Sequence, residues 1–147
     1  MKWERGAFTI SDRREDLDDD CIYQFLSDRS YWSKGIPRAI VIKALDSSLC
    51  FGVFRGKEQV GFGRVITDRA TFAYLSDVFI LASYRGQGLG KWLVECMMEH
   101  SELQGLRRWM LATADAHQLY QQYGFGPLGK PDMLMEKLDP NVYQRYD

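Results

Sequence analysis

The middle third of the chain has the hydrophobic pattern of β-strands. β-Branched and aromatic side chains, which favour strands, are concentrated in three segments, residues 49–55, 59–67 and 71–81. Two polar pairs, Gly56-Lys57 and Asp68-Arg69, separate these segments, and connections this short join antiparallel neighbours. The pattern predicts an antiparallel meander of three strands.

The spacing of apolar residues becomes helical after the meander. One helix face collects the large side chains at intervals of three and four residues, at Leu89, Trp92, Leu93, Cys96, Met97 and His100. Lys91, Glu95 and Glu99 fall on another face, as expected for an amphipathic helix that covers a sheet. Because Cys96 and His100 belong to the apolar face, we expect them in the core and not in catalysis.

One strand and two short helices are predicted before the meander, and residues 7–10 form the strand. The acidic run of residues 16–20 precedes apolar positions at helical spacing. Carboxylates stabilise helix N-termini, so this run is interpreted as a helix start and not as a metal site. Residues 30–36 break the pattern, and Pro37 suits the first turn of the second helix.

Three elements are predicted after the long helix. They are a short strand, a helix that ends at Gly124 and a final strand, at residues 109–112, 115–123 and 133–138. The long helix crosses over to the short strand, which is therefore expected to lie parallel to its neighbour. The prediction is an α/β (α+β) fold with a mixed, mainly antiparallel twisted sheet and helices on both faces.

Composition and charge limit the class of protein. A chain of 147 residues with 46% hydrophobic residues has the size of one domain, so residues 1–147 are interpreted as a single domain. With 19 basic and 20 acidic side chains, no overall positive charge attracts nucleic acid or an anionic membrane. The chain has no apolar run of membrane-spanning length and no secretory signal, which predicts a cytoplasmic protein. Three cysteines without a CxxC pair and two histidines predict no disulfide framework and no metal site.

The segment that carries chemistry is the glycine-rich loop before the long helix, Arg85-Gly86-Gln87-Gly88-Leu89-Gly90-Lys91. Glycines let the backbone turn tightly, and the start of the helix offers unpaired amides to an anion. Arg85 and Lys91 add positive charge, so we expect the loop to bind a pyrophosphate. A Walker loop would need a hydroxyl side chain at Trp92, and a dinucleotide fingerprint would need glycine at Lys91 or Leu93.

The pattern Arg85-x-x-Gly88-x-Gly90 after a hydrophobic strand resembles the first signature of the GNAT superfamily of acyl-CoA N-acyltransferases. Residues 119–125, with the sequence LYQQYGF, are similar to the second signature of that family. The order of predicted elements also matches the family over essentially the whole chain. Residues 29–37 and 115–117 resemble an uncharacterised bacterial subgroup.

The resemblance implies acetyl-CoA as the acyl-donor cosubstrate and no metal. In the family, the strand that precedes the glycine loop diverges from its parallel neighbour at a β-bulge, and the pantetheine arm inserts there. This strand ends here with Val78, Phe79 and Ile80. Such a ligand satisfies the backbone groups that a diverging strand leaves unpaired. The phosphate contacts of the family fall on the amides of residues 86–91, and its oxyanion contact falls on the backbone N–H of Phe79.

The second signature implies a catalytic tyrosine. Tyr120 matches the residue with which many family members return a proton to the departing CoA thiolate. The alternative is that Tyr120 only packs on the apolar face of its helix. Thr113 stands where the family often has an asparagine that contacts pantetheine, which weakens that one contact.

The sequence identifies the acceptor site less closely than the acetyl-CoA site. An alkylammonium must lose a proton before it attacks, and Asp77 is the carboxylate nearest the expected β-bulge, with Tyr74 close by on the same strand. The base is therefore Asp77, Tyr74 or a group reached through water, and Asp77 could equally be a structural carboxylate. Tyr31 and Trp32 fall in the segment that lines the acceptor cleft of the family, or they fill the core.

The resemblance thus implies an N-acetyltransferase that moves the acetyl group of acetyl-CoA directly to a primary amine in a ternary complex. The acceptor is a small molecule or a peptide that the sequence does not identify. The alternative is a CoA-binding regulatory module without transferase activity, which Tyr120 and a reachable base argue against. Dimers are frequent in the family, so a homodimer is compatible with the resemblance.

Overall fold

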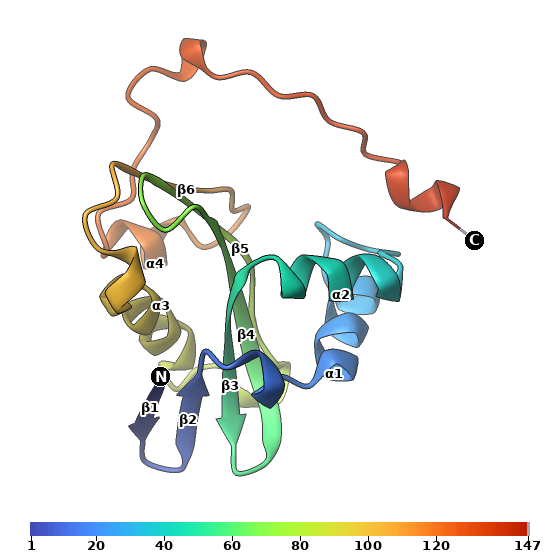
Figure 1. Cartoon of the computed structure of the whole chain (residues 1–147), viewed down its shortest axis with the longest axis vertical. Helices are drawn as coiled ribbons and strands as arrows, with labels where there is room; N and C mark the ends of the chain where they lie inside the picture. The colour runs from blue at the N-terminus through green and yellow to red at the C-terminus, as the bar shows by residue number, and fades with distance from the viewer. Residues whose placement is uncertain (147) are drawn as a thin grey trace.

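A six-stranded mixed sheet organises residues 1–146, which the computed structural model describes. The strands lie side by side in chain order (Figure 1): β1 (Lys2–Arg5), β2 (Phe8–Ser11), β3 (Leu49–Arg55), β4 (Glu58–Thr67), β5 (Phe72–Ile80) and β6 (Arg108–Leu111). Neighbours from β1 to β5 are antiparallel, whereas β6 runs parallel to β5. The predicted mixed, mainly antiparallel sheet is confirmed.

Helices cover both faces of the sheet, as predicted (Figure 1). One side carries α1 (Asp19–Gln24), which continues into a π-helical turn (Phe25–Arg29), and α2 (Arg38–Asp46). The other side carries α3 (Leu89–Glu99) and α4 (His117–Gln121). Each side has its own apolar core, with Phe62 and Phe79 facing α1 and α2, and Phe51 and Leu75 in the cluster that contains α3.

The helix starts follow from local chemistry. Asp18 caps α1, because its carboxylate accepts hydrogen bonds from the amides of Asp20 and Cys21, both at 3.1 Å. The acidic run is therefore a helix start, as predicted. The predicted helix over 115–123 begins only at His117, because the Thr113 hydroxyl accepts the Ala116 amide at 3.0 Å and holds a turn before it.

Two predicted strands differ from the structure. The single N-terminal strand is a hairpin of β1 and β2, which the polar sequence of β1 concealed. The predicted strand over 133–138 is wrong: this segment is extended, but it pairs with no strand within residues 1–146. A 3₁₀ turn at Pro131–Met133 directs it away from the sheet, and Figure 1 shows it as part of a long arm that leaves α4.

The three cysteines are free thiols. Cys50 and Cys96 are buried and Cys21 is half-buried, so Cys96 lies in the core as expected. Burial raises the pKa of the Cys21 thiol to about 11 and the pKa values of Cys50 and Cys96 to about 12. All three thiols are therefore protonated at neutral pH, a state in which thiols are poor nucleophiles.

None of the helices in residues 1–146 has the length and apolar character that crossing a bilayer requires.

A buried polar pair joins the end of β2 to the end of α3. Nε2 of His100 lies 2.7 Å from Oδ2 of Asp12, and Nδ1 accepts the amide of Glu102 at 3.1 Å. The ammonium group of Met1 donates to the other oxygen of Asp12 at 2.7 Å. Burial by itself raises the pKa of the Asp12 carboxyl. The Met1 ammonium group and His100 together lower this pKa by more than burial raises it, so the net pKa is below its usual value.

We expect acid to weaken the fold in part through Asp12. Because the pKa of its carboxyl is lower in the folded than in the unfolded chain, the carboxylate stabilises the fold above about pH 4, and the stabilisation is lost as the pH falls through the folded-state pKa. Asp12→Asn should therefore lower the free energy of unfolding more at pH 6 than at pH 3, as measured by urea unfolding. Equal losses at both pH values would contradict this role.

Candidate active site

The loop between β5 and α3 presents backbone amides to solvent. Gly86 and Gly88 have φ angles of +83° and +82°, a region that side chains disfavour. A Cβ atom at either position would meet nothing within 4 Å, so the requirement for glycine here is conformational. The first bond of α3 runs from the Trp92 amide to the Gly88 carbonyl at 3.0 Å, which leaves the amides of residues 89–91 ahead of the bonded turns.

Side chains around this loop have different roles. Arg85 is exposed, and its Nε donates to the Ile80 carbonyl at 2.8 Å, which ties the loop to the end of β5. Lys91 is also exposed. The Leu89 side chain is 3% exposed and belongs to the core, so its backbone amide is the group that faces the loop. The loop therefore combines amides with two cationic side chains, which suits an anion.

A β-bulge interrupts the pairing of β4 with β5. One residue of β4, Gly63, opposes two residues of β5, Asp77 and Val78, because the register shifts between Phe62 and Arg64. Asp77 has a φ angle of +56°. Bulges of this kind increase the local twist and change the direction of side chains. This bulge lies beside Asp77, where the family resemblance implied it.

Beyond the bulge, β5 and β6 diverge. Their parallel pairing covers only residues 72–75 and 108–111, and a cavity of about 380 Å³ lies where they separate. One wall consists of residues 74–78 and the opposite wall of residues 111–116. Six of the predicted site residues line this cavity: Tyr31, Trp32, Tyr74, Asp77, Val78 and Tyr120.

Asp77 places a negative charge in the wall of the cavity. Its side chain is 8% exposed and forms an ion pair with Arg64, with 2.9 Å between Nε and Oδ2. The indole Nε1 of Trp32 donates to Oδ1 at 2.7 Å, so Asp77 also fixes that ring. Sequence reasoning missed Arg64, although it is the one charge within the predicted strand 59–67. Each carboxylate oxygen retains a lone pair that can accept a further hydrogen bond.

The aromatic residues before α2 lie at the mouth of the cavity. Tyr31 and Trp32 are 64% and 40% exposed, so these two rings do not fill the core. They pack edge to face with their centroids 4.9 Å apart. The Tyr31 hydroxyl accepts the Ala114 amide at 3.1 Å, which joins this N-terminal segment to the opposite wall.

Tyr120 lines the cavity and is 8% exposed. Burial, with a smaller contribution from the Asp115 carboxylate, raises the pKa of its phenol to about 12. Tyr120 therefore keeps its proton at neutral pH and can donate it. The ring also packs edge to face on Phe125. Tyr120 therefore both packs against its neighbours and forms part of the cavity wall.

The side chains of the predicted strand end, Val78 and Phe79, lie on opposite sides of the sheet. Val78 lines the cavity. The Phe79 ring instead stacks on Phe25 at 3.8 Å between centroids, on the side of α1, and its backbone pairs with Phe62 of β4. Within residues 1–146, no group of three His, Cys, Asp or Glu side chains is arranged to hold a metal ion.

Comparison with known proteins identifies the family. Residues 19–125 match the model of the acetyltransferase (GNAT) family. This chain belongs to the GNAT family. The signatures at Arg85–Gly90 and Leu119–Phe125 were therefore interpreted correctly, and the protein is an acyltransferase. GNAT enzymes use acetyl-CoA.

Two relatives match nearly the whole GNAT fold. A Gibberella zeae protein named as an acetyltransferase is 37% identical, and the match covers 82% of this chain and 79% of that one. A GNAT-family acetyltransferase from Xanthomonas campestris has 48% sequence identity to this chain. Its crystal structure matches with a TM-score of 0.92, over 95% of this chain and 99% of that one. A GNAT acetyltransferase from Elizabethkingia anophelis, whose structure contains acetyl-CoA, shares the fold with a TM-score of 0.61, at 16% identity, over 83% of this chain and 78% of that one.

We expect the Arg64–Asp77 pair to be energetically coupled. Arg64→Met leaves a mostly buried carboxylate without its cation and should cost about 3 kcal/mol of unfolding free energy. In an Asp77→Asn background the same change should cost much less, because Asn tolerates the positive φ angle and carries no charge. A double-mutant cycle by urea unfolding measures the coupling, and additive effects would contradict it.

Proposed function

We propose that this GNAT enzyme moves the acetyl group of acetyl-CoA to a primary amine by direct transfer within a ternary complex. The observation that carries the proposal is the continuity of β5. Residues 78–80 run from the cavity between the diverging strands to the exposed glycine loop. A single extended pantetheine arm along this stretch would join a diphosphate at the loop to a thioester in the cavity.

The cofactor side of the proposal uses mainly backbone groups. Amides of residues 86–91, namely Gly86, Gln87, Gly88, Leu89, Gly90 and Lys91, would hold the diphosphate with the charge of Arg85 beside them. The β5 backbone at residues 78–80 has no β6 pairing, so the amides of pantetheine would satisfy the groups there that neither β4 nor Arg85 already binds. Such contacts require extended backbone and not particular side chains.

The chemical step follows from the cavity walls. The amine nitrogen attacks the thioester carbonyl carbon, the carbon–sulfur bond breaks, and the thiolate leaves. We assign the proton returned to sulfur to Tyr120, whose raised pKa keeps it protonated. A backbone N–H on the β6 side of β5 is the candidate donor to the tetrahedral oxyanion, because Phe79, to which the resemblance assigned this contact, pairs with Phe62 of β4. Asp77 is the candidate base, with Tyr74 or a water relay as the alternatives.

The walls of the cavity also indicate the acceptor. Three aromatic residues, Tyr31, Trp32 and Tyr74, and two carboxylates, Asp77 and Asp115, line one space of about 380 Å³. Aromatic faces and carboxylates both attract an alkylammonium group, and this volume suits a small molecule or the end of a peptide. A cationic primary amine in the cytoplasm is therefore the proposed acceptor. The open cavity beside a protonated Tyr120 favours this enzyme over a purely regulatory CoA-binding module.

We expect Gly88→Ala to weaken binding of acetyl-CoA. The left-handed backbone that aims the loop amides disfavours alanine by about 1–2 kcal/mol, so the loop should distort and the dissociation constant should rise about tenfold. Gly105→Ala is the matched control, since Gly105 also has a positive φ angle, +72°, and no atom within 4 Å of its Cβ position. Calorimetric titration should show a loss of affinity only for Gly88→Ala. Equal losses in both variants would contradict binding at the loop.

We expect Tyr120→Phe to lower kcat about 100-fold, because the thiolate loses its proton donor. Affinity for acetyl-CoA should change less than twofold. Release of the CoA thiol, measured over a panel of primary amines, gives the rate and identifies the acceptor. Because the pKa of Tyr120 is about 12, wild-type activity should not fall between pH 8 and 10 through ionisation of this residue. An unchanged kcat in Tyr120→Phe would exclude it as the donor.

A further inference from the structure

Three apolar side chains form a row across β4, β5 and β6. Ile66 lies opposite Tyr74, and Tyr74 lies opposite Met110. Residues directly opposite one another in a sheet point to the same face. Ile66 also follows Phe62 by four residues, so it shares the face that α1 and α2 cover at Phe62. The apolar row, Ile66, Tyr74 and Met110, therefore lies on the α1 and α2 side of the sheet.

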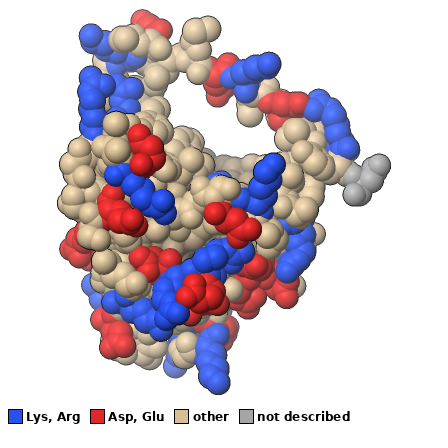
Figure 2. Space-filling model, in the orientation of Figure 1, with Lys and Arg blue, Asp and Glu red and all other residues tan. Residues whose placement is uncertain are grey.

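The helices leave the apolar row uncovered. Ile66 is 42% exposed, and Tyr74 and Met110 are half-buried. Among the described residues, both apolar cores pack without any of these three side chains. The arm after α4 crosses toward α2 (Figure 1), and Figure 2 shows open space between this arm and the body. A contiguous group of accessible apolar side chains marks a binding surface.

The apolar row continues into the cavity between β5 and β6. Tyr74 belongs to both, because it lines the cavity together with Asp77. The walls near these two residues are mainly apolar and include Leu75, Val78, Leu111 and Ala112. A ligand with a cationic group at Asp77 would therefore extend an apolar body toward the row.

The charges that flank Ile66 on β4 are already engaged within the protein. The Asp68 carboxylate accepts the amides of Ala70 and Thr71 at 2.9 and 2.8 Å, and Arg64 is paired with Asp77. Neither side chain is free to bind a charged group above the row. This part of the surface therefore suits an apolar group.

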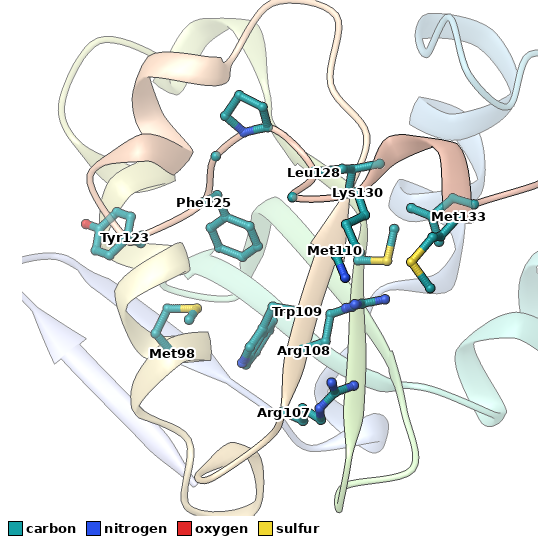
Figure 3. A pocket seen from close by; sticks show the side chains of 15 residues that line it. Met98, Arg107, Arg108, Trp109, Met110, Tyr123, Phe125, Leu128, Lys130 and Met133 are labelled. Atoms are coloured by element: carbon teal, nitrogen blue, oxygen red, sulfur yellow. The ribbon is translucent and has the colours of Figure 1, made fainter.

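The other end of the row lies beside a cation. Arg108 precedes Met110 by two residues and is exposed. Figure 3 shows Arg108 and Met110 on the same side of β6, opposite to Trp109. A ligand with a second ammonium group at this end would meet the positive charge of Arg108, which repels it.

We propose that the acceptor is an amphipathic primary amine with a single amino group, which reacts beside Asp77 while an apolar chain lies on the apolar row. This inference rests on the proposed function and names its substrate class. Tyr74 and Asp77 are three residues apart on β5, which corresponds to about 10 Å along an extended strand. An extended alkyl chain of about eight carbons has that length.

The first test compares three amines as acceptors for the full chain, with release of the CoA thiol as the measurement. Octylamine reaches the row and propylamine does not, so kcat/KM should be at least about 30-fold higher for octylamine, as burial of several methylene groups requires. The octyl diamine, which carries an amino group at each end, should react at least about tenfold less efficiently than octylamine, because its second ammonium group would have to leave water beside Arg108.

The second test changes the row. Ile66→Asp places a carboxylate on it and should lower the ratio of kcat/KM for octylamine to that for the octyl diamine at least about tenfold, because the new charge repels the alkyl chain and attracts the second ammonium group. Leu138→Asp is the matched control, since Leu138 is 69% exposed in the arm, outside the row and the cavity. Its ratio should equal that of the wild type. Near-ultraviolet circular dichroism verifies folding, and Met110→Glu provides a second row variant.

The outcomes separate this inference from the proposed function. If no amine releases the CoA thiol although calorimetry shows binding of acetyl-CoA, the proposed function fails and the inference fails with it. If propylamine and octylamine react equally well, the transferase function stands and the inference is overturned. An Ile66→Asp variant that changes the mass of the particle in solution but not the amine selectivity would show that a protein surface occupies the row, and it would also overturn the inference.

Discussion

The bulge at Asp77 is the constraint on which the rest of the site depends. A regular β5 would continue its pairing with both neighbours, and the space beside β6 would close. The extra residue opposite Gly63 turns the end of β5 away from β6, and the ion pair of Asp77 with Arg64 holds that turn from the neighbouring strand. Because Trp32 donates to the same carboxylate, the geometry of the sheet and the position of an acceptor-side ring are linked.

The cavity that results draws on distant parts of the chain. One wall comes from the meander, the other from β6 and the turn before α4, and its mouth from the aromatic segment before α2. The hydrogen bond from Ala114 to Tyr31 connects the last two of these. Glycine-loop amides, by contrast, come from one local segment. The proposed anion site is thus a local product of the sequence, whereas the proposed acceptor site depends on the complete fold.

This difference explains what could be predicted from the sequence. Strong periodicity in β3, β4, β5 and α3 and the spacing of the glycine loop are local signals, so those elements and the family were predicted. Arg64 could have been noticed as a charge in an apolar strand, but its partner depended on a register that a bulge shifts. Residues 133–138 have the composition of a strand, yet pairing requires a neighbour, and within the described residues no strand lies beside them. Composition alone therefore predicted a strand where the structure has none.

The buried thiols have a practical consequence for enzymology. Chromogenic disulfides, which detect liberated CoA, react with thiolates, and Cys21, Cys50 and Cys96 hold their protons to about pH 11 or above in the folded protein. Colour that develops during turnover therefore comes from the product. Unfolding makes the three cysteines accessible to the same reagent, so a trace recorded without acetyl-CoA reports the integrity of the catalyst.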